Sequence, residues 1–184
     1  MIELAVTPEI RLSQISLSNA HEIFSTIDTQ REYLGVWLPF VPFTKTIDDT
    51  FSFISSVIDA PPDRAELIFV IYYQNTFAGI IGFRDTDRLN RKTELGYWLS
   101  QPFQGKGIII QSVKRLIEYA FAEREMNRIQ IRCAVGNHSS KKIPQQLGFL
   151  LERIERDGEL LASGEYTDLE VYSMLKKEYS NQHN

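Results

Sequence analysis

The chain has 184 residues, of which 43% are hydrophobic and 24% charged. This is the composition of an ordinary globular protein that can bury one core, so we expect a single domain over residues 1–184. The net charge of −4 argues against nucleic acid as the main partner. A single cysteine excludes an internal disulfide and suits a reducing cytoplasm. No signal peptide is visible, and the longest apolar run, residues 67–73, is too short to span a membrane.

The first third of the chain predicts one strand and two helices. Residues 9–16 alternate apolar and polar side chains, which indicates a strand. A helix follows from Ser18 or Asn19, and a second begins at Thr46 or Asp48 and ends at the prolines at 61 and 62. Between the helices, two prolines predict an extended segment over residues 37–43. Its aromatic side chains either cover an edge of the core or form the wall of a cleft.

The middle of the chain predicts a hairpin and then a strand–helix–strand unit. Residues 67–73 and 76–84 form the hairpin around Gln74-Asn75, and residues 93–99 form the next strand. Residues 108–123 carry an apolar stripe with helical spacing, and residues 128–135 alternate as a strand does. A strand, a helix and another strand in this order predict two parallel neighbours joined by a right-handed crossover.

The last part predicts a short helix from Asn137 to Leu147-Gly148 and two strands, residues 149–156 and 166–175. A turn at Asp157-Gly158 and a polar loop are expected to join the strands, and residues 176–184 are expected to fray. The whole order predicts an α/β (α+β) fold with a mixed sheet of about seven strands and about four helices.

The segment from Gln101 to Ile110 links the strand at 93–99 to the helix at 108 and contains two glycines. Free amides and the positive end of a helix dipole can hold a phosphate there. The segment fits neither a phosphate-binding NTPase loop, because Lys106 precedes a glycine, nor a dinucleotide fingerprint, because Ile110 stands at the third glycine position. The residues alone also allow a plain loop-to-helix turn.

Two motifs resemble those of the GNAT superfamily of acetyl-CoA-dependent N-acetyltransferases. Residues 104–109 match the pyrophosphate motif [QR]-x-x-G-x-[GA] except for Ile109 in the last position. Residues 137–149 match N-x-x-[AS]-x-x-x-Y-x-x-x-G-F, except that Pro144 replaces the tyrosine, which in many members protonates the departing thiolate. The resemblance implies acetyl-CoA as co-substrate. It assigns this molecule to Trp98, Leu99, Gln104, Gly105, Lys106, Gly107, Ile108, Ile109 and Asn137.

Within this superfamily, the chain resembles the ribosomal-protein-serine and -alanine N-acetyltransferases over about residues 10–179. The likeness rests on the order and spacing of residues 37–39, 94–99, 105–107, 137–140 and 166–175. It implies direct acetyl transfer to an α-amine, with a protein N-terminus as the acceptor. The substrate-contacting residues would be Trp37, Phe40 and Tyr97.

Three residues are candidates for proton transfer. Glu94 or Glu159 could act as general base, although Glu94 also suits a structural ion pair and Glu159 a solvated turn. Ser140 could simply cap its helix, but the resemblance makes it the proton donor for the CoA thiolate. Cys133 suits a buried apolar position, and the three histidines lack metal-ligand spacing, so no metal is expected.

Two other functions remain open at this point. One is acetylation of a small amine such as a polyamine or an aminoglycoside. The other is a non-catalytic acyl-CoA sensor, which Pro144 and Ile109 would allow. Neither a nucleic acid nor a membrane is expected as a partner, and a homo-oligomer is left open.

Overall fold

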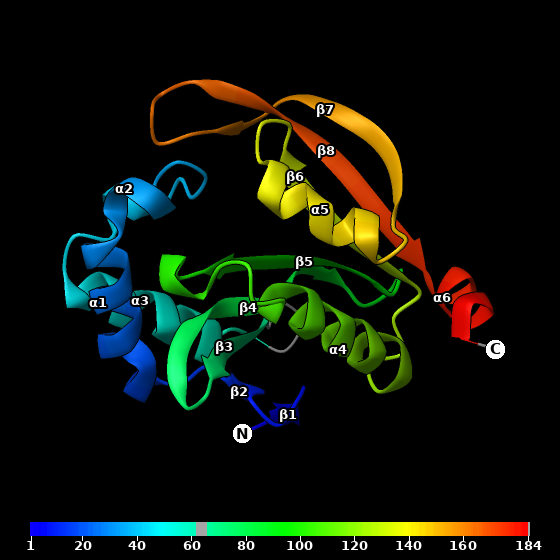
Figure 1. Cartoon of the computed structure of the whole chain (residues 1–184), viewed down its shortest axis with the longest axis horizontal. Helices are drawn as coiled ribbons and strands as arrows, with labels where there is room; N and C mark the ends of the chain where they lie inside the picture. Colours follow the sequence, from blue (N-terminus) through cyan, green and yellow to red (C-terminus); the bar gives the residue numbers. More distant parts are fainter. Residues whose placement is uncertain (62–65, 184) are drawn as a thin grey trace.

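The computed structural model describes residues 1–61 and 66–183, and Figure 1 shows their arrangement. Eight strands form one sheet: β1 (Glu3–Ala5), β2 (Ile10–Gln14), β3 (Leu67–Tyr73), β4 (Thr76–Asp87), β5 (Lys92–Leu99), β6 (Arg128–Ala134), β7 (Leu150–Leu160) and β8 (Tyr166–Leu175). The α-helices are α1 (Ala20–Thr29), α2 (Arg31–Leu34), α3 (Ile47–Ile58), α4 (Ile108–Ala122), α5 (His138–Gln146) and α6 (Lys176–His183). Three 3₁₀ turns are η1 (Leu17–Asn19), η2 (Val41–Phe43) and η3 (Gln101–Phe103).

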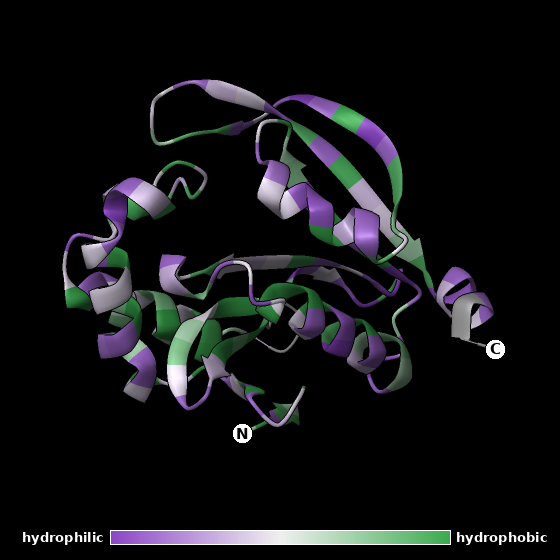
Figure 2. Cartoon of the chain, viewed as in Figure 1, coloured by the Kyte–Doolittle hydropathy of each residue, from purple (hydrophilic) through white to green (hydrophobic). Residues whose placement is uncertain are grey.

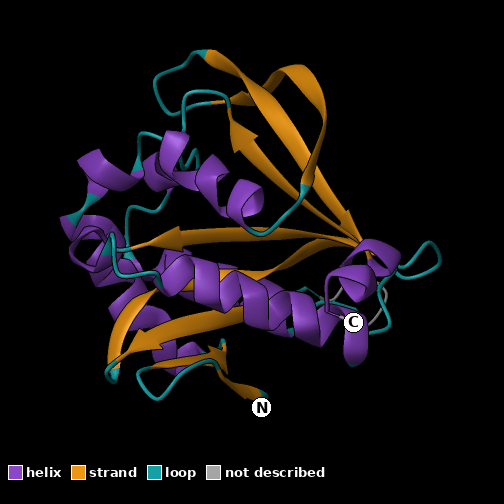
Figure 3. Cartoon of the chain, turned by 45° about the vertical axis from the view of Figure 1, so that its right-hand side comes forward, coloured by secondary structure: helices purple, strands orange, loops and turns teal. Residues whose placement is uncertain are grey.

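The strands lie in the order β1-β2-β3-β4-β5-β6-β8-β7. All neighbours are antiparallel except β5 and β6, which are parallel and joined through α4. The predicted mixed α/β sheet and its parallel pair are therefore confirmed. The pairing of β5 with β6 covers residues 92–94 and 128–130 and then ends, and the two strands diverge beyond that point (Figures 1 and 3).

Two apolar clusters lie on opposite faces of the sheet. On one face, α4 packs over β2 to β6 and buries Leu116 together with Phe69 of β3. On the other face, α1 and α3 pack over β3 and β4 and bury Ile23 and Ile54 together with Val70. Both faces of β3 are thus covered, which explains its continuous apolar sequence. Figure 2 shows the apolar residues gathered in these central strands.

Several boundaries differ from the sequence prediction. The short strand β1 was not expected, and β7 continues through Asp157 and Gly158 to Leu160 instead of turning there. Residues 37–43 form turns and η2 rather than the extended segment that the prolines predicted. The C-terminal residues form α6 rather than a frayed tail. The end expected for the second helix lies partly at residues 62–65, outside the described residues.

No helix in the described part of the chain is long and apolar enough to cross a membrane. The opening where β5 and β6 separate is the feature of this fold that offers space for a ligand.

Candidate active site

The loop from Gln104 to Gly107 connects η3 to the first turn of α4. Gly105 and Gly107 have φ angles of 73° and 72°, a left-handed conformation that glycine adopts without strain. The side chains of Ile108 and Ile109 point into the core and are 1% and 9% exposed. They anchor the start of the helix while the loop itself stays at the surface.

The amides of this loop are available to a ligand. Among the described residues, no backbone oxygen accepts a hydrogen bond from the amides of Gly105, Lys106 or Gly107. The amides of the first turn of α4 lack partners by the geometry of any helix start. The loop therefore presents converging N–H groups at the positive end of a fifteen-residue helix. This arrangement fits the pyrophosphate of acetyl-CoA.

Side chains from α2 and from the residue between α1 and α2 hold the loop in place. Gln104 donates a hydrogen bond from Nε2 to the Tyr33 hydroxyl at 2.6 Å, and that hydroxyl donates to the Leu99 carbonyl at 3.1 Å. Gln30 donates a hydrogen bond from Nε2 to the Ser100 hydroxyl at 2.8 Å, and its Oε1 accepts one from the Gln101 amide at 2.9 Å. The cofactor loop and the segment that leads to Trp37 are thus joined by hydrogen bonds.

The end of β5 forms one edge of the opening in the sheet. Trp98 and Leu99 pair with Ile80 and Gly79 of β4, whereas the pairing of β5 with β6 has already ended at Glu94. The Trp98 ring packs edge-on against Phe77, with centroids 5.8 Å apart. The backbone on the β6 side of this segment is free to pair with the pantetheine arm, which suits the expected role of Trp98 and Leu99.

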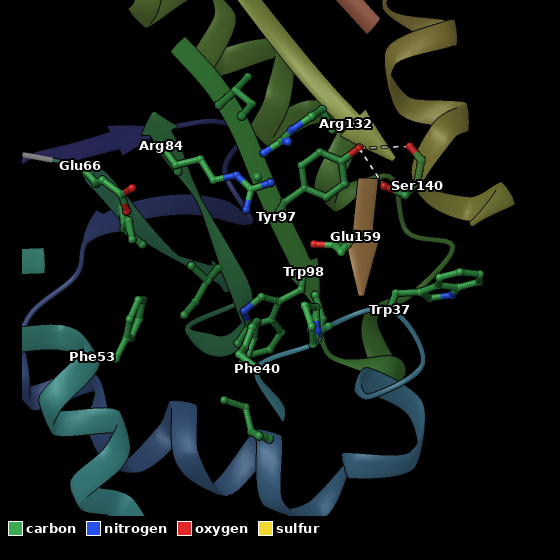
Figure 4. Close-up of a pocket in the computed structure, with 18 of the residues that line it drawn as sticks. Trp37, Phe40, Phe53, Glu66, Arg84, Tyr97, Trp98, Arg132, Ser140 and Glu159 are labelled. Atoms are coloured by element: carbon green, nitrogen blue, oxygen red, sulfur yellow. Dashed lines mark hydrogen bonds between the residues drawn. The ribbon is translucent and has the colours of Figure 1, made fainter. Parts of the chain in front are cut away.

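A pocket of about 500 Å³ occupies the opening (Figure 4), a volume within the range of small-molecule sites. Its lining comes from α1, α3, the segment 37–44, the start of α5 and strands β3 to β7. Several candidate residues named from sequence line it: Trp37, Phe40, Tyr97, Trp98, Asn137, Ser140 and Glu159. The fold therefore brings together residues up to 122 positions apart (from 37 to 159) in one cavity.

Glu94 lies behind the pocket in a network of charges. Its side chain is 1% exposed, and one carboxylate oxygen accepts hydrogen bonds from Arg84, one of them at 2.7 Å. The other oxygen accepts from Gln130 at 2.9 Å and from Arg132 at 2.6 Å. Both oxygens are occupied, so Glu94 has the geometry of the structural ion pair that its sequence position also allowed.

Glu159 takes a different position, because β7 carries its side chain directly into the pocket. In Figure 4 the carboxylate points toward the space between Tyr97 and Trp98. Burial raises the pKa of Glu159, while Arg84 and Arg132 act in the opposite direction. A half-buried carboxylate with a raised pKa is suited to accept a proton near neutral pH.

Ser140 lies in the first turn of α5, opposite this carboxylate. Its amide donates to the Asn137 side chain at 3.1 Å, so Asn137 rather than Ser140 caps the helix. The Ser140 hydroxyl donates to the Tyr97 hydroxyl at 3.3 Å and lies 3.4 Å from the Cys133 sulfur. Burial raises the pKa of the Cys133 thiol to about 11, which makes it a poor nucleophile.

The wall on the acceptor side comes from the segment after α2. Trp37 packs against Gly136, where an added Cβ would lie 3.0 Å from the indole ring. Phe40 also lines the pocket and is 40% exposed. The aromatic residues at 37 and 40 therefore form part of the cleft, as one of the two sequence interpretations predicted.

The sequence did not single out Arg84, Arg132 and Glu66, which also line the pocket. A signal existed for Arg132, which lies on the polar side of an otherwise alternating strand. The contact between Tyr97 and Ser140 joins residues 43 positions apart and has no local signal.

Comparisons with known proteins agree with this geometry. The model of a family described as acetyltransferase (GNAT) domain matches residues 9–150. This chain belongs to the GNAT acetyltransferase family. It is 34% identical over 186 residues to the "Putative ribosomal N-acetyltransferase YdaF" of Bacillus subtilis (strain 168), covering 99% of this chain and 100% of that protein. It is 26% identical to the ribosomal-protein-serine acetyltransferase of Escherichia coli (strain K12), covering 94% and 96%.

Solved structures of GNAT proteins have the same fold. A structure of RimL, a ribosomal L7/L12 α-N-protein acetyltransferase in complex with coenzyme A, superposes with a TM-score of 0.91 at 23% identity, covering 96% of this chain and 99% of that one. The microcin C7 self-immunity acetyltransferase MccE, in complex with acetyl-CoA and AMP, superposes with a TM-score of 0.87 at 30% identity, covering 92% and 94%. The chain is therefore an N-acetyltransferase that uses acetyl-CoA as its co-substrate.

No group of three or more His, Cys, Asp or Glu side chains in residues 1–61 and 66–183 could hold a metal ion.

Proposed function

We propose that this chain acetylates the α-amine at the N-terminus of a protein or peptide, with a ribosomal protein as the acceptor, in the cytoplasm. The observation that carries the proposal is the placement of Glu159 and Ser140 in one pocket, at the open end of the β5–β6 pair. The names of the two curated relatives support the acceptor class. A homo-oligomer remains a prediction from the sequence.

An α-amine suits this pocket because of its acidity. With a pKa of about 7.7–8.0, roughly a tenth or more of it is neutral at pH 7, whereas a lysine amine of pKa about 10.4 is almost fully charged. The carboxylate of Glu159 then needs only to accept the proton that the amine releases as it attacks. No acyl-enzyme is required, and the thiol of Cys133 takes no part.

We assign the remaining steps to four parts of the site. The amides of residues 105–109 bind the pyrophosphate, and the free edge of β5 at Trp98 and Leu99 orients the pantetheine arm. Asn137 holds the first turn of α5, which brings the Ser140 hydroxyl to the sulfur. Ser140 supplies a proton to the departing thiolate, the role that the sequence motif would give to a tyrosine at Pro144. Trp37 and Phe40 contact the acceptor chain.

Glu94 was an alternative base, and we assign it a different role. Two guanidinium groups and an amide already occupy its carboxylate. It therefore holds Arg84 and Arg132 in place beside the pocket. These two arginines offset part of the negative charge that Asp49, Glu66 and Glu159 give to the pocket, so a polycation gains less there than at a wall of carboxylates alone.

The test is a comparison of acceptors with acetyl-CoA as donor, followed by mass spectrometry. The panel contains a peptide that begins with serine, the same peptide beginning with alanine, an N-terminally blocked copy that contains a lysine, and spermidine. We expect one acetyl group on each free N-terminus and none on the blocked peptide or on spermidine. Acetylation of spermidine alone, or of the lysine in the blocked peptide, would overturn the proposed acceptor.

A further inference from the structure

The hydroxyl of Tyr97 belongs to a chain of hydrogen bonds that passes through Ser140 (Figure 4). Tyr97 donates to the Ser140 carbonyl at 3.1 Å, and the Ser140 hydroxyl donates to the Tyr97 oxygen at 3.3 Å. A serine hydroxyl has one proton, so at 3.4 Å the Cys133 thiol is the donor to the Ser140 oxygen. The order of donors is therefore Cys133 to Ser140 to Tyr97.

This order has a consequence for proton transfer. The proton of Ser140 lies on the bond to Tyr97 and not in the pocket. A serine hydroxyl is also a weak acid, close to water at about 15.7, whereas a cysteine-like thiol has a pKa of about 8.5 and a tyrosine about 10. A proton taken from Ser140 alone would leave an alkoxide, whereas a proton taken from Tyr97 leaves a phenolate, in which the ring shares the negative charge.

We propose that Tyr97 is the source of the proton that Ser140 delivers to the departing thiolate. The inference rests on the proposed function, which names Ser140 as the donor. As the carbon–sulfur bond breaks, its electron pair stays on the sulfur, which takes the proton of Ser140. In the same movement the Ser140 oxygen takes the proton of Tyr97, whose hydroxyl reverses its hydrogen bond. The negative charge ends on the phenol oxygen.

The protons released and taken up in one reaction cycle balance without another reactant. Glu159 holds the proton that the attacking amine released and gives it to water when the products leave. Tyr97 then regains one proton from water, so that the free enzyme returns to its starting charge. Tyr97 acts through Ser140 and is in this sense a positioning residue, whereas Ser140 touches the reacting sulfur.

The surroundings of Tyr97 keep its phenol protonated in the resting enzyme. Burial raises the pKa of Tyr97, and Cys133 raises it further, so the phenol holds its proton throughout the neutral range. The charged groups that line the pocket near it are Arg84 on β4, Arg132 on β6 and Glu159 on β7, with Glu66 and Asp49 farther along the wall. Glu94 on β5 lies behind the two arginines, and Lys141 on α5 pairs with Glu170 on β8 at 3.0 Å. Among the described residues, Tyr97 is the one tyrosine that lines the pocket.

The first test is Tyr97→Phe, which removes the hydroxyl and keeps the ring. We expect kcat to fall about ten- to hundredfold, the lower part of the range for general acid catalysis, with KM for acetyl-CoA within threefold of the parent. The matched control is Tyr172→Phe. The Tyr172 hydroxyl is also hydrogen-bonded, to Glu170 and Gln145, but Tyr172 is not among the residues lining the pocket. The control should keep the parental kcat, and melting temperatures measured on both variants report their folding.

A second readout separates proton transfer from a packing role. A fluorinated tyrosine placed at position 97 keeps the shape of the ring and lowers the pKa of the phenol. If Tyr97 must be protonated, the alkaline limb of the kcat profile moves to lower pH. An alkaline limb that stays in place would overturn the proposal even if Tyr97→Phe is slow.

Double variants separate this inference from the proposed function. If Tyr97 acts through Ser140, adding Tyr97→Phe to Ser140→Ala has little further effect on kcat. Additive losses, or a parental kcat in Tyr97→Phe beside a slow Ser140→Ala, would overturn the relay and leave the role of Ser140 intact. A parental kcat in Ser140→Ala would instead contradict the proposed function itself.

Discussion

The two ends of the β5–β6 pair differ in the ion-pair partners that they offer to a nearby glutamate. At the paired end, Glu94 is buried, and donors from Arg84, Gln130 and Arg132 occupy its carboxylate. At the open end, the carboxylate of Glu159 faces the pocket with no direct ion pair among the described residues. Glu94 is therefore held in ion pairs, whereas Glu159, which β7 brings to the open end, has a carboxylate without such a partner among the described residues.

The difference follows from the length of the parallel pairing. The strands are paired only through Glu94 and Gln130, and beyond that level a gap separates the two backbones. A carboxylate at the last paired level can be surrounded by donors, and this compensates for its burial. A carboxylate beyond it keeps part of its contact with solvent and substrate. Burial alone thus does not indicate a proton acceptor, because its carboxylate must also have free lone pairs directed at a cavity.

Removal of the free carboxylate should have the largest effect. Glu159→Gln is expected to lower kcat about a hundred- to a thousandfold, because no group then accepts the proton of the amine. The raised pKa of Glu159 also fixes the direction in which the rate changes with pH. The base is active when ionised, so the rate of the parent falls as pH drops through that pKa, and the variant lacks this limb. Steady-state rates from pH 5 to 9 check both. A variant with the rate and profile of the parent would contradict the role.

Removal of the fixed carboxylate should act on stability instead. Glu94→Gln leaves Arg84 without its counter-charge and Arg132 with Asp85 alone, at 3.7 Å. It is expected to cost about 2–3 kcal/mol of unfolding free energy, a moderate figure because both arginines still reach solvent. Urea unfolding measures the loss, and kcat per folded molecule should change less than tenfold. If Glu94→Gln kept the stability of the parent but lost as much rate as Glu159→Gln, the roles assigned to the two glutamates would be reversed.

The cofactor loop gives a smaller and more selective prediction. Gly107→Ala forces an alanine to a φ of 72°, at a cost of about 1–2 kcal/mol, and shifts the amides that would hold the pyrophosphate. We expect KM for acetyl-CoA to rise about tenfold with kcat within twofold of the parent. Gly164→Ala is the matched control, since Gly164 has a φ of 86° in the β7–β8 turn. A similar rise in KM for the control would show that strain alone is responsible.

The parts of the site that could be predicted from sequence are local. Two glycines before a helical stripe indicate the loop, and the alternating strands on both sides of α4 indicate the parallel pair. The motif of Asn137 and Ser140 is also local, since it spans one helix turn. In these cases, nearby residues set the backbone conformation, so their spacing carries the information.

The contacts that could not be predicted join distant segments. Gln104 reaches Tyr33 across 71 positions, and Ser140 reaches Tyr97 across 43. The turn expected at Asp157-Gly158 is an instance where pairing overrides a local signal. There the pairing of Glu159 with Thr167 keeps the strand going, and a Cβ at Gly158 would lie 2.9 Å from Leu169. That continuation is what carries Glu159 into the pocket.

The smallest effect concerns an ion pair at the paired end, outside the pocket. Arg128 donates to Glu152 at 2.5 and 2.6 Å, and Ser173 donates to the same carboxylate at 2.8 Å. These contacts lower the pKa of Glu152 to about 2, with the Arg128 hydrogen bond as the main cause. A lowered pKa means that the stabilisation is complete above the ordinary value of 4.5 and is lost as pH falls toward 2.

We therefore expect Glu152→Gln to lower the unfolding free energy by about 1 kcal/mol at pH 7, a modest figure because the side chain is 36% exposed. The difference from the parent should shrink steadily below pH 4.5 and vanish near pH 2, in urea unfolding curves at each pH. Glu155→Gln is the control, since Glu155 meets Arg153 at 3.6 Å with both side chains exposed, and it should match the parent throughout. A difference for Glu152→Gln that stays constant with pH would mean that packing, and not the charge of the paired end, is responsible.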